Sequence, residues 1–175
     1  MLKKKSAFVL PVVVLLFLSL ITTASTVGTR VEAQNGDKEQ HQTVYIQSIQ
    51  SGNGKISIVA DEINWYQGED ADRIFAEREP EAAAEIGGAL DAYYIVNDSD
   101  TLTNYPVADN AVVTMQIFDH TGNLDDLDIN WNEKITLEQF INHYNSTDVF
   151  DLSQFPYHIT IQEGIITSIV QQYVP

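Results

Sequence analysis

The chain has 175 residues, no cysteine, and 25 acidic against nine basic residues, which give a formal net charge of −16. A surface with this negative charge repels nucleic acid and anionic membranes. It permits a cation or a cationic peptide as a partner. The alternative is that the charge serves only to keep the protein soluble. The lack of cysteine excludes disulfides, a thiol nucleophile and a stable lipid anchor through cysteine.

Residues 1–33 have the order of a secretory signal peptide. Three lysines at positions 3–5 precede an apolar run of 15 residues, 7–21, and small and polar residues follow. This run is shorter than the ~20 residues of a typical membrane-spanning helix. We therefore expect export, with cleavage after Ala24 or after Ala33; an uncleaved N-terminal membrane anchor is the alternative.

The expected location follows from this signal and from the composition. A cysteine-free exported chain with a lysine-rich start is typical of bacteria, above all of Gram-positive ones. We expect the protein to be secreted or to lie on the extracellular face of the cell envelope, where an envelope component is a further conceivable partner. Residues 34–42 are predicted to be a disordered spacer, and residues 43–175 a single globular domain. After Ala33, 24 acidic residues face five basic ones, a net charge near −19.

The first half of the domain predicts a hairpin and a helical region. Two β-type runs flank the turn cluster at residues 51–54, which predicts a hairpin over residues 44–59. Residues 69–79 have apolar positions at helical spacing and acidic residues in the first turn. Because Pro80 follows, residues 69–86 form either two short helices or one helix broken at that proline.

The second half predicts further strands and one helix. Strands are expected at residues 92–96, at 102–107, where Pro106 indicates an edge or an end, and at 111–118. An acidic loop over residues 119–128 follows. Thr136 opens a helix with a capping box, and residues 157–173 form a second hairpin around the turn Glu163-Gly164.

These elements have the order ββ-α-βββ-α-ββ, without the strand–helix alternation of a parallel sheet. We predict an α+β fold, mainly antiparallel, with a small barrel-like sheet of the OB-like or SH3-like kind and two or three short helices, because closure removes exposed strand edges. An open antiparallel sheet with helices on one face is the alternative.

The acidic loop is a candidate calcium site. Asp119, Asn123, Asp125 and Asp128 place side-chain oxygens within ten residues, and calcium takes about six to eight oxygen ligands. The Asp-x-Asp-x-Asp-Gly order of an EF-hand is missing. The loop is thus either a calcium site with these four ligands or a solvated acidic turn, and no other cofactor is expected.

Aromatic pairs are the candidate ligand-binding residues. On a strand, adjacent side chains point to opposite faces, so one ring of each of the pairs Trp65-Tyr66 and Tyr93-Tyr94 is expected to be exposed. With the first acidic residue of the following helix, the predicted ligand-binding residues are Trp65, Tyr66, Glu69, Tyr93 and Tyr94. Aromatic rings more often simply fill a core.

Catalytic motifs are missing. The sequence holds no Gly-x-Ser-x-Gly elbow and no His-Glu-x-x-His. His158 is expected on the strand face opposite Tyr157 and Ile159, as a surface residue rather than a base. No catalytic residues are therefore predicted.

Three segments resemble small secreted proteins of Gram-positive bacteria. They are Asp-Glu-Ile-Asn-Trp-Tyr-Gln-Gly-Glu-Asp-Ala at residues 61–71, Phe-Pro-Tyr-His-Ile-Thr-Ile at 155–161 and Gln-Gln-Tyr-Val-Pro at 171–175. The resemblance covers the domain and implies bacterial export and one domain. It implies no catalytic residue, cofactor or activity.

The leading prediction is an exported, non-enzymatic binding module of the cell envelope or the extracellular space. A secreted hydrolase that uses acidic residues or a metal is the competing class. A cluster of Asp, Glu and His in a cleft would favour the hydrolase, and an aromatic surface without such a cluster would favour binding.

The export signal makes a direct prediction. Mass spectrometry of protein recovered from culture medium should find a new N-terminus near Ser25 or Gln34, because cleavage follows the small-residue pattern. Recovery of the full-length chain from the membrane fraction alone would establish the anchor instead.

Overall fold

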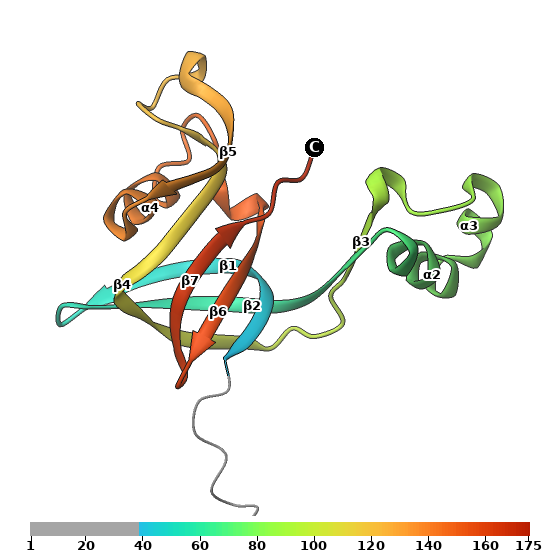
Figure 1. Ribbon diagram of the computed structural model, residues 1–175, viewed down its shortest axis with the longest axis horizontal. Helices are drawn as coiled ribbons and strands as arrows, with labels where there is room; N and C mark the ends of the chain where they lie inside the picture. The colour runs from blue at the N-terminus through green and yellow to red at the C-terminus, as the bar shows by residue number, and fades with distance from the viewer. Residues whose placement is uncertain (1–38) are drawn as a thin grey trace, which may run out of the picture. The chain divides into compact units, whose positions relative to one another are not determined.

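A computed structural model describes residues 39–175 (Figure 1). The predicted signal peptide and residues 34–38 of the predicted spacer lie outside the described residues. The first strand, β1 (Gln40–Gly52), begins inside the predicted spacer. Assigning residues 40–42 to a disordered spacer is therefore wrong. These residues pair with residues 159–161 of β6 (Pro156–Gln162), so backbone hydrogen bonds order a stretch whose polar composition suggested disorder.

The predicted N-terminal hairpin is confirmed. β1 is followed by β2 (Lys55–Gln67). The two residues between them, Asn53 and Gly54, both have positive φ, of 53° and 73°. Two such residues form the mirror-image turn whose twist matches a hairpin, and asparagine and glycine adopt this conformation at low cost.

The two predicted helices are confirmed as α2 (Glu69–Arg78) and α3 (Pro80–Ile86), with the break at Pro80. A short 3₁₀ turn, η1 (Leu90–Ala92), leads into β3 (Tyr93–Val96), which pairs with the end of β2. We call residues 64–96 the arm. Arg73 pairs with Asp70 and Glu77 within α2, whereas Arg78 pairs with Asp98.

The strands predicted at residues 102–107 and 111–118 are one strand, β4 (Leu102–Asp119). It changes partners instead of ending: residues 102–107 pair with β2, and residues 112–114 pair with β7 (Ile165–Gln171). Pro106 pairs with Ser57 of β2 and has no partner on β7. It therefore lies in a part of β4 that is paired on one side only. The 3₁₀ turn η2 (Leu124–Asp126) and a strand that was not predicted, β5 (Leu127–Ile135), follow.

The predicted capping box is confirmed at α4 (Leu137–Tyr144): the Thr136 hydroxyl accepts from the Gln139 backbone N–H, and the Gln139 side chain accepts from the Thr136 N–H. A 3₁₀ turn, η3 (Leu152–Gln154), precedes β6. The second predicted hairpin is confirmed as β6 and β7. Its turn residues, Glu163 and Gly164, have φ of 51° and 78°.

The sheet closes into a barrel. Its strand order is β3-β2-β1-β6-β7-β4-β5, and an additional pairing of β2 with β4 joins five strands, β1, β2, β4, β6 and β7, into a ring. All these pairs are antiparallel except β4 with β7. A five-stranded barrel with this order, and with a helix between its third and fourth strands, is of the OB-like kind. The predicted α+β barrel is thus confirmed over the open sheet.

Buried apolar side chains fill this barrel. Of the nine core residues that the strand and helix faces predict, seven are buried: Ile46, Ile58, Val113, Met115, Phe140, Ile159 and Ile161. Ile95 and Ile117 are partly exposed. Ile95 belongs to the arm, outside the ring of strands, and Ile117 follows an irregularity in the β4–β5 pairing. Among residues 39–175, no helix has the length and the apolar composition needed to cross a bilayer.

Within the β6–β7 hairpin, truncation of a buried side chain should cost more stability than truncation of an exposed one. Ile159 is 1% exposed, so Ile159→Ala should lower the free energy of unfolding by about 2–5 kcal/mol. Ile165, which is 39% exposed, is the matched control, and Ile165→Ala should cost less than about 1 kcal/mol. Urea denaturation measures both; equal losses would contradict this assignment of the barrel interior.

Candidate functional site

Two aromatic rings stack where the arm leaves the barrel. In the pairing of β2 with β3, Trp65 lies opposite Ile95 and Gln67 lies opposite Tyr93. Trp65 and Tyr93 therefore share one face of this ribbon. Their ring centroids are 4.7 Å apart, and their planes are 8° from parallel. Such a pair adds about 0.5–1.5 kcal/mol beyond its buried area, so each ring holds the other in place.

The other predicted ligand-binding residues lie elsewhere on the arm. Tyr66 and Tyr94 are paired on the opposite face of the ribbon. Tyr94 packs edge-on against Phe75 of α2, with ring centroids 5.5 Å apart. Glu69 is exposed at the start of α2. The structure thus keeps Trp65 and Tyr93 together and separates them from the other three residues.

His158 extends the stacked pair across the barrel surface. It lies between buried Tyr157 and Ile159 on β6 and faces outward, as predicted. Its ring packs edge-on against Trp65, with centroids 6.3 Å apart. Nε2 lies 3.0 Å from Oε1 of Gln172, and Nδ1 lies 3.0 Å from the Thr43 hydroxyl. With the Gln172 oxygen as acceptor, Nε2 carries the proton and Nδ1 accepts from Thr43.

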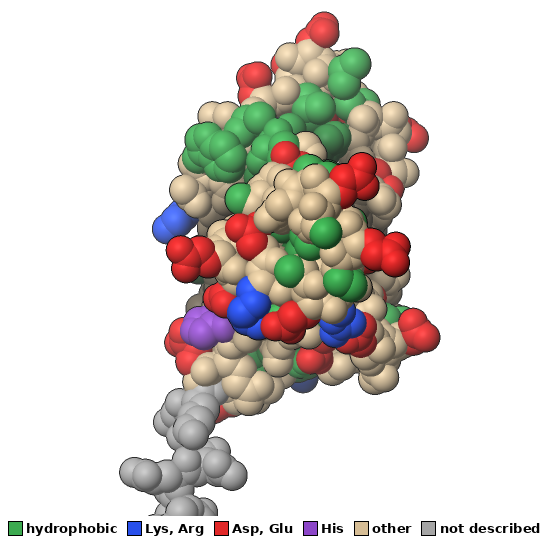
Figure 2. Space-filling model, turned by 90° about the vertical axis from the view of Figure 1, so that its right-hand side faces the viewer, with side chains coloured by type: hydrophobic (Ala, Val, Ile, Leu, Met, Phe, Trp, Pro, Cys, Tyr) green, Lys and Arg blue, Asp and Glu red, His purple; other side chains and the backbone are tan. Residues whose placement is uncertain are grey.

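The C-terminal segment continues this series of rings. Tyr173 follows Gln172 and packs edge-on against Trp131 of β5, with centroids 5.5 Å apart. Trp131 is 65% exposed. These rings form two groups, which the bond of Gln172 to His158 joins. We call the five residues together the aromatic band: Trp65, Tyr93, His158, Tyr173 and Trp131. Hydrophobic side chains also gather on the upper part of the surface shown in Figure 2, with acidic side chains around them.

One polar group in the aromatic band lacks a partner. The indole N–H of Trp65 is buried and makes no hydrogen bond within residues 39–175. A buried donor without an acceptor costs about 1–3 kcal/mol, and a water molecule or a ligand oxygen would recover that energy.

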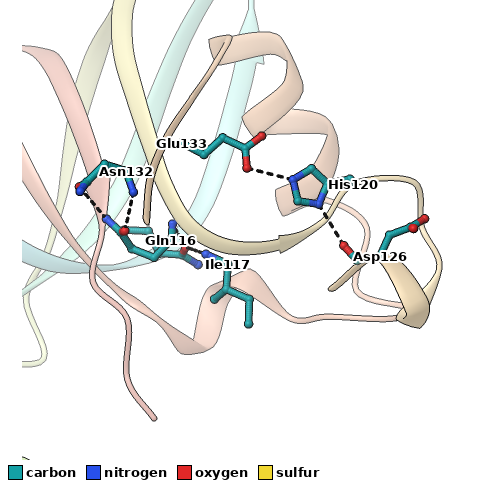
Figure 3. A network of polar contacts seen from close by, with 7 residues as sticks. Gln116, Ile117, His120, Asp126, Asn132 and Glu133 are labelled. Atoms are coloured by element: carbon teal, nitrogen blue, oxygen red, sulfur yellow. Dashed lines mark hydrogen bonds and ion pairs between the residues drawn. The ribbon is translucent and has the colours of Figure 1, made fainter. Parts of the chain in front are cut away.

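A bulge in β5 sets the position of Trp131. Met115 pairs with Glu133 and Ile117 pairs with Ile129, so three β5 residues, 130–132, lie opposite the single residue Gln116. The Gln116 side chain holds the bulge, because its Oε1 accepts from the Asn132 N–H at 2.8 Å (Figure 3). Bulges redirect side chains at strand edges, and here the bulge is the segment that presents the exposed indole.

Gln171 supports the bulge from β7. Its Oε1 accepts from the backbone N–H groups of Gln116 and Ile117, at 2.8 and 2.9 Å. The residue is 1% exposed, and its Nε2 has no partner within residues 39–175. One carboxamide oxygen thus satisfies two donors that the irregular β4–β5 ladder leaves unpaired. The C-terminal segment that carries Tyr173 starts from this anchored residue.

A second polar cluster lies beyond the bulge. Nε2 of His120 is 3.0 Å from Oε2 of Glu133, and its Nδ1 is 3.0 Å from the backbone oxygen of Asp126 (Figure 3). Both neighbours accept hydrogen bonds, so the two contacts favour the doubly protonated form of the ring. The hydrogen bond to Glu133 raises the pKa of His120 above its ordinary value. The ring therefore holds η2 to β5 and has no free nitrogen.

His143 and Asp119 complete this cluster around Phe118. The Phe118 ring lies 4.0 Å from the ring of His120 and 4.9 Å from that of His143, which α4 supplies. Nδ1 of His143 is 4.0 Å from Oδ1 of Asp119, an ion-pair distance without a hydrogen bond. Asp119 is buried, and this oxygen has no hydrogen-bond partner within residues 39–175.

The predicted calcium ligands are not brought into one set. Asp119 is buried beside α4, whereas Asp125 and Asp128 are exposed, and Asn123 bonds Thr121. Within residues 39–175, no three or more His, Asp or Glu side chains are arranged to hold a metal ion. Residues 127 and 128 also belong to β5 instead of the loop. Calcium binding therefore stays a prediction from sequence, without a ligand set in the structure.

Sequence reasoning missed three members of the aromatic band. His158, Tyr173 and Trp131 are far apart in the chain, and the pairing of distant strands brings them together. Strand alternation did indicate that His158 faces outward. The apolar spacing of Leu127, Ile129 and Trp131 could have indicated β5. Comparisons with protein-family models, with curated proteins and with solved structures found no match.

The His120–Glu133 pair predicts a dependence of stability on pH. Glu133→Gln removes the charge that raises the pKa of His120, so this pKa should fall toward its ordinary value near 6.5. A raised pKa in the folded state stabilises the protein below about pH 6.5, and this contribution is lost as pH rises through the folded-state pKa. The loss of melting temperature in the variant should thus be larger at pH 5.5 than at pH 8.

Nuclear magnetic resonance titration of the His120 ring measures this pKa directly. The exposed Glu138 of α4 is the matched control, because Glu138→Gln removes the same charge away from His120. Identical titration curves in the wild type and in Glu133→Gln would contradict the pairing.

Proposed function

We propose that this protein is a non-enzymatic binding module that works outside the cytoplasm, at a Gram-positive cell envelope, and that its aromatic band binds a neutral glycan. The observation that carries the proposal is the aromatic band itself: a group of three rings and a group of two, joined through the hydrogen bond of Gln172 to His158, with an indole at one end that is 65% exposed. The export signal and the resemblance to secreted Gram-positive proteins support the location.

The acidic composition of the domain excludes anionic ligands. Residues 39–175 carry 23 acidic and four basic side chains, so an anionic polymer is repelled. Aromatic faces offer apolar area with one polar handle, which suits the flat faces and hydroxyl edges of sugar rings. Barrels of the OB-like kind include oligosaccharide binders, a likeness of architecture that is support by analogy.

A hydrolase is the weaker candidate. The cluster of Asp119, His120, Glu133 and His143 supplies the residue types that it needs. However, both ring nitrogens of His120 already form hydrogen bonds within the fold, and a general base needs a free nitrogen within reach of substrate. The contacts of the cluster hold η2, β5 and α4 together, which is a structural role.

Binding to glycan tests the proposal. Trp65 and Trp131 are the two tryptophans of the chain, and both belong to the aromatic band, so intrinsic fluorescence reports occupancy without a label. Addition of a soluble uncharged oligosaccharide, such as a cello-oligosaccharide, should quench or shift this emission. Trp131→Ala should weaken binding roughly three- to tenfold, the value of one aromatic contact.

The control is an exposed apolar side chain outside the aromatic band. Leu102 is 52% exposed on β4, and Leu102→Ala should leave the affinity unchanged. Because Trp131 is largely exposed, its variant should keep the wild-type melting temperature within a few degrees. Unchanged emission at millimolar glycan, or equal affinities of the two variants, would refute binding at the aromatic band.

A further inference from the structure

A cavity of about 440 Å³ lies at one end of the barrel, and it shares no residue with the aromatic band. Its position follows from the strand register. Glu62 pairs with Val44 and Thr103 pairs with Ala60, and both partners are fully buried in the core. Glu62 and Thr103 thus continue the inward-facing rows. The cavity is formed where these rows change from apolar to polar residues.

The lining of this cavity is rich in hydrogen-bonding groups. Beside Glu62 and the apolar Ile63, it consists of two amides and three hydroxyls: Gln42, Asn64, Ser99, Thr101 and Thr103. Its volume lies within the range of roughly 300–1,000 Å³ that is typical of small-molecule sites, and barrel mouths are among the places where such sites occur. Paired donors and acceptors of this kind match a ligand with several hydroxyl groups.

Glu62 gives the cavity a negative charge that the protein does not neutralise. Its Oε1 accepts from the Tyr105 hydroxyl at 2.5 Å, while Oε2 has no hydrogen-bond partner among residues 39–175. Burial and this bond raise the pKa of Tyr105 to about 12, so the phenol remains a donor. No lysine, arginine or histidine belongs to the lining. Both arginines of the described residues are paired with other carboxylates.

Asp61, at the base of the arm, is a second carboxylate, but it does not line the cavity. Asp61 precedes Glu62, and its Oδ2 accepts from Asn97 at 2.7 Å. Its Oδ1 is buried without a partner within residues 39–175. The cavity thus holds one carboxylate, that of Glu62, with no cation in contact. This favours a positively charged ligand, since a charge-assisted hydrogen bond is roughly twice as strong as a neutral one.

We propose that this cavity binds a small hydroxylated ligand that carries a protonated amine, of the amino-sugar class. The ammonium group contacts the free oxygen of Glu62, and the hydroxyl groups of the ligand bond the amides and hydroxyls of the lining. The aromatic band contributes nothing to this site, so the inference is independent of the function proposed above.

Three ring compounds test the proposal on the full chain. Glucosamine carries the amine, glucose replaces it with a hydroxyl, and N-acetylglucosamine removes its charge. Calorimetry at pH 6.5 should find glucosamine bound at least tenfold more tightly than either neutral sugar. Equal affinities for the three sugars, or no detectable binding of glucosamine at tens of millimolar, would overturn the proposal.

Glu62→Gln isolates the charge, because glutamine keeps the shape and an oxygen that can accept from Tyr105. It should weaken glucosamine binding at least tenfold. Glu138→Gln, which removes the same charge at a separate cavity lined by α4, and Trp131→Ala should both bind as the wild type does. Equal affinities of Glu62→Gln and Glu138→Gln would overturn the proposal.

A measurement on the wild type keeps the proposal testable if Glu62→Gln fails to fold. Titration with glucosamine should shift the backbone amide resonances of residues 62–64 and 101–103 together. Shifts confined to other residues would overturn the site.

Discussion

The pairing of β2 with β4 is the contact on which the rest of the structure depends. Residues 56–61 pair with residues 102–107 and close the five strands into a ring. Closure leaves no open edge among these strands and encloses one core. It also uses only part of two long strands, since β2 has 13 residues and β4 has 18. The remaining length of each strand has to pair elsewhere, β2 with β3 and β4 with β5.

These two extensions provide the candidate site. The extension of β2 presents Trp65 beside Tyr93, and the extension of β4 carries the bulged strand with Trp131. Neither ribbon alone makes a surface of any size. The C-terminal segment joins them, because Gln172 bonds His158 and Tyr173 packs against Trp131. The aromatic band therefore depends on the closed barrel, which fixes β6, β7 and both extensions together.

The sequence predicts those parts of the molecule whose signals are local. The hairpin turn at Asn53-Gly54 and the capping box at Thr136 are decided within a few residues, and both are confirmed. β5 was missed because it is an edge strand, nearly all of it exposed, and its bulge with Asn132 at positive φ interrupts the alternation. β4 was divided because the polar residues Asp109 and Asn110, where it changes partners, interrupt the apolar pattern. The aromatic band and the cavity depend on long-range register, which no local pattern encodes.

In both proposed sites, the net charge of the domain and the local contacts contribute separately to ligand recognition. At physiological salt the Debye length is about 8 Å, so the excess of acidic residues repels anions only near the surface and attracts cations without choosing among them. Discrimination among these ligands requires direct contacts at distances shorter than the Debye length. Glu62 lies in a cavity whose other polar groups are neutral, and the tryptophan and tyrosine rings of the aromatic band carry no formal charge. In the two proposed binding events, the net charge therefore determines which ligands approach, and the arrangement of the rings and of the Glu62 carboxylate determines which of them stay bound.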